Sequence, residues 1–235
     1  MEFCDKIKNI MAFDVKITTR ISILDLIMPY TCRGCGHLGE LLCERCKKYI
    51  IQPEMRDGWI MAVGRREGAL MRLTEEYKYK SIRRTAPVLA DLMERAIGEL
   101  TDKDASAKVD LAGEVVVVPL PTIVKHIRER GFDHTLRLAK VLAKRRGWEC
   151  RSLLTRVNKA VQVGSNAEMR KKQAKTAYEL KPDAARFLKG AKDKTYLLID
   201  DISTTGASLE AAREILQKNG AKRVFGAVVC VGLND

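Results

Sequence analysis

The stretch LLIDDISTTGAS, residues 197–208, joins an apolar run to two acidic residues and then to a short turn rich in hydroxyl groups. The overlapping segment TYLLID (195–200) predicts a strand buried within a sheet. The segment ASLEAAREILQKNG (207–220) predicts a helix that ends at Gly220, a residue type favoured after the last helical turn. A strand that leads through a small turn into a helix is the repeating unit of α/β proteins, so this stretch predicts that fold class.

The rest of the chain extends this pattern. EVVVVPLP (114–121) and RVFGAVVCVG (223–232) predict buried strands, and RSLLTRV (151–157) predicts a shorter one. HTLRLAKVLAKRRG (134–147) has apolar residues along one helical face. Strands that alternate with helices predict a mostly parallel sheet with helices on both faces. Upstream, we predict helices over 21–29, 67–80 and 85–100, a strand over 59–64 and a loop over 101–110.

The composition is that of an ordinary soluble protein. The chain has 235 residues, of which 46% are hydrophobic and 31% are charged, enough for one substantial domain with a smaller appendage. No apolar stretch approaches the roughly 18 residues that are needed to cross a membrane. Acidic and basic residues interrupt the apolar residues at the N-terminus, which is untypical of a signal peptide. We therefore expect a cytoplasmic protein without membrane insertion.

The net charge of +13 is concentrated in one third of the chain. Residues 125–194 carry 20 Lys and Arg against 7 Asp and Glu, whereas the rest of the chain is balanced at 23 against 23. A basic segment of this kind predicts contact with an anion, either the phosphates of a small ligand or a nucleic-acid backbone. A solvated basic surface is the alternative.

Four of the seven cysteines lie close together in the sequence. Cys32 and Cys35 form one CxxC pair, Cys43 and Cys46 form a second, and seven residues separate the pairs. This spacing is typical of a structural zinc site with four thiolate ligands and no open position. A redox pair or a coincidental grouping is the alternative. The single histidine nearby, His37, is interpreted as a surface residue.

The turn after residue 202 has the properties of an anion site. Ser203, Thr204, Thr205 and Gly206 lead into a helix whose first N–H groups lack intrahelical partners, at the positive end of the helix dipole. Glycine allows the backbone to approach a phosphate closely. The residues that we assign to the phosphate are Ser203, Thr204, Thr205, Gly206, Ala207 and Ser208.

The two acidic residues need another partner, because they would repel a phosphate. Asp200 and Asp201 are hydrogen-bond acceptors when ionised, which suits the vicinal hydroxyl groups of a ribose. A ribose 5-phosphate therefore fits both halves of the stretch. In the alternative interpretation, the acidic pair ends a strand and Ser203 begins a helix, without a ligand.

These residues resemble the PRPP-binding motif of type I phosphoribosyltransferases, in which an apolar run, two acidic residues and a Thr-Thr-Gly turn follow one another. VVVVPLPTIVKHIRERGFDHTLRLAKVLA (115–143) is similar to the strand, turn and helix of the ComF family. ISILDLIMPYTCRGCG (21–36) and EYKYKSIRRTAPVLADLM (76–93) resemble the same family. The resemblance implies a type I phosphoribosyltransferase-like fold with a small N-terminal zinc knuckle. We expect a helical segment over 1–29, the knuckle over 30–50 and the transferase-like domain over 51–235.

The resemblance also implies PRPP as the ligand, with Mg²⁺ on its pyrophosphate. Asp200 and Asp201 would then be the catalytic acidic pair, and Arg128 and Arg130 would lie on the pyrophosphate side. Lys78 is placed where it reaches a phosphate or stays exposed on a helix. A lid is expected over 156–178, although this chain lacks the Asn and Gly that related sequences carry there.

Two functional hypotheses follow. The first is a PRPP-dependent transferase whose acceptor the sequence does not define. The second is a non-catalytic module that binds single-stranded DNA and acts with the competence machinery to which the ComF family is linked. Paired acids in a basic cleft favour the first, and an aromatic content of 6% weighs against stacked bases. Four basic residues are assigned to the lid or to DNA: Arg170, Lys171, Lys172 and Lys175.

Overall fold

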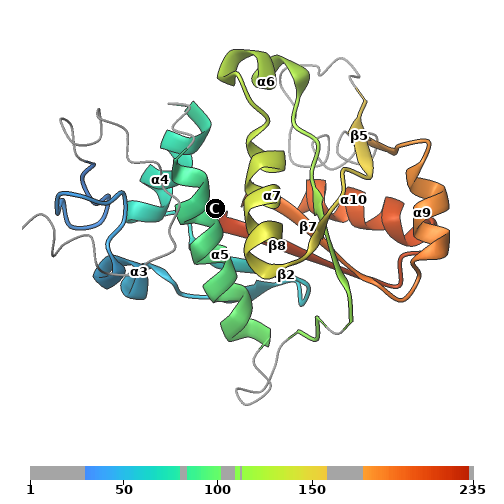
Figure 1. Ribbon diagram of the computed structural model, residues 1–235, viewed down its shortest axis with the longest axis horizontal. Coiled ribbons are helices and arrows are strands. Elements are labelled where there is room, and N and C mark those ends of the chain that lie inside the picture. The colour runs from blue at the N-terminus through green and yellow to red at the C-terminus, as the bar shows by residue number, and fades with distance from the viewer. Residues whose placement is uncertain (1–29, 80–83, 102–108, 112, 158–176, 233–235) are drawn as a thin grey trace, which may run out of the picture.

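The computed structural model describes residues 30–79, 84–101, 109–111, 113–157 and 177–232 (Figure 1). Its centre is a six-stranded sheet in the order β1-β2-β8-β7-β3-β4, in which β1 is antiparallel to β2 and every other neighbouring pair is parallel. The predicted α/β fold with a mostly parallel sheet is thereby confirmed. The strands are β1 (Glu54–Arg56), β2 (Ile60–Arg65), β3 (Val115–Pro119), β4 (Glu149–Cys150), β7 (Thr195–Ser203) and β8 (Arg223–Val231).

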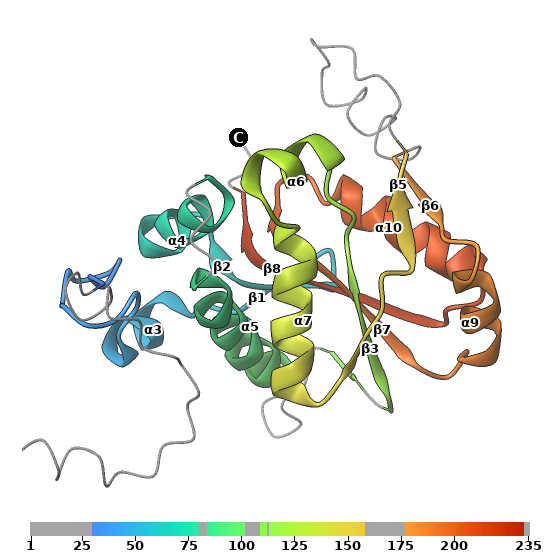
Figure 2. The same ribbon diagram turned by 45° about the horizontal axis from the view of Figure 1, so that its top comes forward.

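Helices cover both faces of the sheet (Figure 2). On one face lie α4 (Gly68–Tyr79), α5 (Thr85–Thr101) and α7 (His134–Arg146). The other face carries α9 (Ala184–Gly190), α10 (Ala207–Lys218) and a two-stranded antiparallel sheet of β5 (Leu154–Arg156) and β6 (Tyr178–Leu180). The short helices α3 (Glu44–Ile50) and α6 (Val124–Arg130) complete the described elements.

Side chains point alternately to the two faces of the sheet along the central strands, so one sheet contributes to two hydrophobic cores. Val115 and Val117 of β3 pack toward α5 and α7, whereas Val116 and Val118 pack toward α10. Successive side chains of a strand point to opposite faces, so an uninterrupted β-branched run fills both. All four valines are buried, as the sequence predicted for a strand covered on both sides.

The ends of α7 follow local signals. The Asp133 carboxylate accepts a hydrogen bond of 3.0 Å from the N–H of Leu136 and caps the first turn. Gly147 ends the helix in the left-handed conformation, with φ 67°. These two residues set where α7 begins and ends, and therefore where its first residue, His134, is placed.

Several elements differ from the sequence prediction. β7 continues to Ser203, so both acidic residues lie inside the strand and not after it. β5 pairs with β6 in the small sheet and not with the main one, and β6 begins at Tyr178, where the expected lid ends. Arg128 and Arg130 lie on a helix, α6, where we predicted a turn. The predicted helix 21–29 and the residues Arg170, Lys171, Lys172 and Lys175 lie outside the described residues.

None of the helices that the structure describes is both long enough and apolar enough to span a membrane.

Candidate functional site

The loop between β7 and α10 forms a small polar pocket. β7 ends at Ser203 and α10 begins at Ala207, so the pocket lies at the carboxyl end of a central strand. Gly206 has a φ of 76°, a left-handed conformation that glycine adopts without strain. The pocket has a volume of about 50 Å³. Its lining is Asp200, Ile202, Ser203, Thr204, Thr205, Gly206, Ala207, Ser208 and Leu209, which includes all six residues assigned to the phosphate.

Groups from elsewhere in the chain hold the carbonyl oxygens of this loop. Nη1 of Arg56 donates hydrogen bonds to the carbonyl oxygen of Ser203, at 3.4 Å, and to that of Thr204. The N–H of Gly232 also donates to the Ser203 carbonyl, at 2.8 Å. The N–H of Ala207 donates a long hydrogen bond, of 3.4 Å, to the Thr205 hydroxyl, and the other N–H groups at the start of α10 are of the kind that binds an anion. Arg56 was not foreseen, since it lies 147 residues before Ser203 and belongs to no motif.

The two acidic residues point to different faces of the sheet. Asp200 lines the loop pocket on the side of α10. The Asp201 side chain lies on the opposite side, 2% exposed, and its Oδ1 is 3.0 Å from Nζ of Lys78 on α4. The expected side-by-side pair is therefore divided by the alternation of the strand. Lys78 forms a buried ion pair instead of being directed at a phosphate.

Burial shifts the titration of this pair. Burial, followed by the negative charge of Asp201, raises the pKa of Asp200 to about 8, although the charge of Lys78 acts in the opposite direction. Two adjacent carboxylates in a buried site do not both ionise easily. Asp200 therefore retains its proton to a higher pH than an exposed carboxyl group does.

Arg128 and Arg130 lie at the same edge of the sheet as the loop pocket. α6 follows the carboxyl end of β3, and β3 is the parallel neighbour of β7. Arg128 is exposed. Arg130 turns back toward α7, where its Nη1 lies 3.0 Å from Nδ1 of His134, and its guanidinium stands 5.7 Å from the ring centroid of Tyr79.

A second and larger pocket, of about 210 Å³, lies beyond the end of β3, the strand next to β7. Its floor is the end of β3 and the residues after it, and Leu120 donates its N–H to the Ile199 carbonyl, next to Asp200. Arg156 and Lys181 supply positive charge to its wall. This pocket provides room for parts of a ligand beyond a ribose phosphate.

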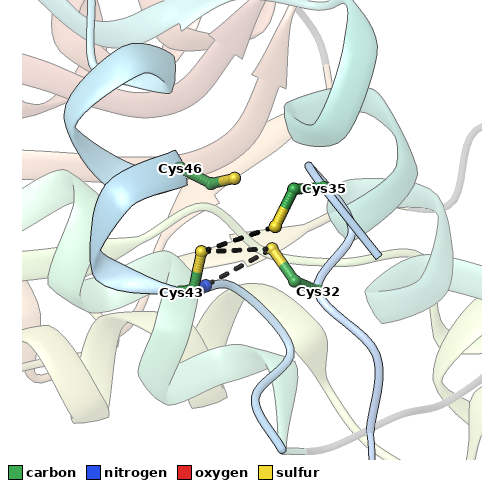
Figure 3. Close-up of side chains that lie close together, drawn as sticks. All are labelled: Cys32, Cys35, Cys43 and Cys46. Atoms are coloured by element: carbon green, nitrogen blue, oxygen red, sulfur yellow. Dashed lines mark hydrogen bonds between the residues drawn. The ribbon is translucent and has the colours of Figure 1, made fainter. Parts of the chain in front are cut away.

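The four cysteines of the N-terminal region meet in space (Figure 3). Cys32 and Cys35 come from the loop before α3, while Cys43 and Cys46 lie at the start of that helix. All four Sγ atoms lie within 4.8 Å of one another, and Cys43 Sγ is 3.7 Å from the Sγ atoms of both Cys32 and Cys35. Zinc bound to four thiolates at about 2.3 Å separates its sulfur atoms by about 3.8 Å. The cluster therefore fits zinc.

Backbone groups around the cluster favour thiolates. Burial opposes ionisation of Cys32, but N–H groups of Cys35, Cys43 and Gly34 lower its pKa to about 6. Gly34 also has no room for a side chain, because a Cβ atom there would lie 2.6 Å from Cys46 Sγ.

Residues 127–234, from α6 to the end of β8, match the protein family described as phosphoribosyl transferase domain. No curated protein sequence matches the chain. Among solved structures, the chain is similar to the glutamine phosphoribosylpyrophosphate amidotransferase from B. subtilis complexed with ADP and GMP, at 15% identity and a TM-score of 0.38. That alignment covers 66% of this chain and only 30% of the amidotransferase.

Two further structures show similarity of the same order. One is the hypoxanthine-guanine phosphoribosyl transferase of L. donovani, at 11% identity and a TM-score of 0.35, covering 62% of this chain and 67% of that one. The other is the phosphoribosylpyrophosphate synthetase of Mycobacterium smegmatis, at 16% identity and a TM-score of 0.34. That alignment covers 71% of this chain and 60% of the synthetase. The family match covers the region 127–234 alone, which is 108 of the 235 residues. The four-cysteine cluster and β3 lie outside the matched range.

Proposed function

We propose that the protein binds PRPP and transfers its phosphoribosyl group to an acceptor. The observation that carries this proposal is the loop pocket, in which Asp200 and the hydroxyl-rich turn adjoin the beginning of α10. The turn would hold the 5-phosphate through N–H and hydroxyl groups. Asp200 would accept hydrogen bonds from the ribose hydroxyls once it has lost its proton.

In this reaction the acceptor attacks C1 of the ribose and the bond from C1 to the pyrophosphate oxygen breaks. The pyrophosphate leaves with the electron pair of that bond. Positive charge develops on the ribose, and negative charge develops on the departing group. Arg128 and Arg130 are the cations that we assign to the pyrophosphate, because α6 and the loop pocket share one edge of the sheet.

Magnesium is the cofactor that we expect to arrive with PRPP, neutralising its pyrophosphate. Asp200 is the carboxylate that lines the loop pocket and is therefore the protein group that we assign to this ion or to its water ligands. Asp201 is already engaged by Lys78 and serves a supporting role.

The finer assignment that we propose is the ComF family, with its link to natural competence and DNA uptake. Three sequence segments resemble that family, and the four-cysteine cluster supports an N-terminal zinc knuckle. We propose zinc as a structural ion and the cytoplasm as the location, where thiols stay reduced and able to bind metal. Every cysteine in the described residues is free of disulfide bonds.

To test the proposed binding of PRPP at the loop pocket, we compare substitutions of two glycines at opposite ends of α10. Gly206 and Gly220 both have positive φ values, of 76° and 106°, so an alanine strains the backbone at either site. Gly206→Ala should weaken binding of PRPP with Mg²⁺ at least tenfold in a calorimetric titration, because Gly206 is part of the pocket. The matched control Gly220→Ala should bind as tightly as the unmodified protein.

The same pair of variants tests the DNA-binding alternative. The exposed cations Lys140, Lys144 and Arg146 of α7 favour that alternative, and each phosphate contact that they make would contribute about 0.7 to the slope of log K against log salt concentration. Equal PRPP affinity in both glycine variants, or no PRPP binding with salt-dependent binding of single-stranded DNA, would refute the transferase proposal.

A further inference from the structure

A buried line of polar contacts connects α6 to β7 next to the loop pocket. Arg130 Nη1 lies 3.0 Å from Nδ1 of His134, and His134 Nε2 lies 3.5 Å from Oδ2 of Asp201. Lys78 completes the line with its contact of 3.0 Å to Oδ1 of Asp201. The side chains of His134 and Asp201 are only 6% and 2% exposed. Three helices and the central strand thus meet at one imidazole ring.

The contacts define which ring nitrogen carries the proton. The guanidinium of Arg130 can only donate, so Nδ1 of His134 accepts. Thr122 Oγ1 lies 3.5 Å from the same nitrogen, at the limit of a hydrogen bond. The proton of the neutral ring is therefore on Nε2, which faces Asp201 Oδ2 at 3.5 Å and Thr135 Oγ1 at 3.3 Å.

Asp201 needs this neighbour. Its buried Oδ2 has no hydrogen-bond partner among the described residues, and Lys78 contacts only the other oxygen. A buried carboxylate oxygen without a donor is costly, so a modest closure of the 3.5 Å gap would satisfy it. Burial lowers the pKa of His134; the nearby Arg130 and Lys78 act in the same direction and Asp201 opposes them, so the ring stays neutral.

We propose that His134 is a positioning residue that orients Arg130 for the pyrophosphate and steadies Asp201 at the ribose end of the site. This inference rests on the proposed function. The 3.0 Å contact between Nη1 and the imidazole fixes one end of the Arg130 guanidinium at the edge of the sheet where the loop pocket lies. Asp201 is joined to Asp200 directly, because the Asp200 carboxylate accepts the N–H of Asp201 at 2.9 Å. A change in Asp201 that shifts its backbone N–H would therefore also shift the carboxylate of the pocket.

The contacts of the two ring nitrogens of His134 can be removed separately by substitution. The amide of His134→Asn occupies the place of Nδ1 and keeps the contact with Arg130, but it cannot reach Asp201. The amide of His134→Gln extends to the place of Nε2 and keeps a donor for Asp201. His134→Leu removes both contacts with an apolar side chain. His126→Gln is the matched control, since His126 is a half-buried histidine of α6 paired with Glu129.

Ribose 5-phosphate and magnesium pyrophosphate are titrated separately into the full chain, with melting temperatures as a check on folding. We expect His134→Asn to lose about tenfold in affinity for ribose 5-phosphate and to keep its affinity for magnesium pyrophosphate. His134→Gln should show the opposite pattern, His134→Leu should lose both ligands, and the control should lose neither.

A purely structural role predicts a different result. The inference is overturned if the Asn and Gln variants lose both ligands equally in proportion to their melting temperatures, or if all variants bind like the unmodified protein. Binding by the unmodified protein separates this failure from that of the proposed function: if it binds neither PRPP nor ribose 5-phosphate, both proposals fall.

Discussion

The four-cysteine knuckle and the α/β body are stabilised by different means. In the body, the central strands are buried on both faces, with residues such as Leu197 and Leu198 fully inaccessible. In the knuckle, α3 buries none of its side chains, and Leu38 and Tyr49 are 61% and 75% exposed. Apolar burial therefore holds the body together, whereas the knuckle depends on its sulfur ligands.

Ion pairs attach the knuckle to the body. Arg33 lies 2.8 Å from the Glu76 carboxylate of α4, and Lys47 lies 3.1 Å from Asp91 of α5. Exposed pairs contribute little and partly buried ones contribute only modestly. Leu42 is the deepest apolar contact of the knuckle, at 1% exposed. A segment of some twenty residues with so few buried apolar side chains is of the kind that a bound metal ion would stabilise, even where a core lies next to it.

The largest expected effect is on metal binding. Cys43→Ser should abolish zinc binding, because structural sites of this type need all four thiolates. Zinc content by elemental analysis should fall from one ion per chain to none, and amide exchange over 30–50 should rise while β7 stays protected. Cys150→Ser, a half-buried thiol far from the cluster in sequence, is the control and should retain its zinc. One zinc per chain in the Cys43 variant, or exchange that rises equally in β7, would remove the distinction between the regions.

The next effect concerns apolar burial. Leu197→Ala in β7 should lower the free energy of unfolding by about 2–5 kcal/mol, because the cavity in a sheet covered on both faces cannot collapse. Leu38→Ala in the knuckle should change it by no more than about 0.5 kcal/mol, since that side chain is already exposed. Urea titrations measure both values. Comparable losses for the two variants would mean that the knuckle has a core of its own.

The smallest effect is a pH dependence that belongs to the body alone. The pKa of Asp200 is raised from 3.8 to about 8 in the folded state, so between these values the folded chain holds a proton that the unfolded chain has lost. This group therefore destabilises the fold as pH rises from 4 to 8. Asp200→Asn does not titrate, so its melting temperature should rise relative to that of the unmodified protein across this window, by at least about 2–4 °C, the shift that about 1 kcal/mol causes in a chain of this size.

Asp183→Asn provides the comparison, because Asp183 is an exposed carboxylate at the start of α9 that accepts no capping hydrogen bond. The difference in melting temperature between Asp183→Asn and the unmodified protein should stay constant with pH. If the difference in melting temperature is also constant for Asp200→Asn, then Asp200 does not retain its proton in the folded protein.

Local patterns in the sequence were sufficient for much of this molecule. The valine run 115–118 predicted a strand covered on both faces, and the segment 207–220 predicted a helix after the hydroxyl-rich turn. The spacing of the four cysteines predicted that their sulfur atoms would meet. Hydrophobic periodicity, turn residues and ligand spacing act over a few residues, so they are visible without knowledge of the fold.

Only the tertiary structure decided how the residues of the site divide their roles. Asp200 and Asp201 look equivalent in sequence, but in the fold the first lines a pocket and the second forms an ion pair with the partly buried Lys78 of α4. Arg56 reaches the loop, and His134 reaches Asp201, because separate segments are brought to one edge of the sheet. Such contacts depend on strand pairing over more than a hundred residues, and no local pattern encodes that pairing.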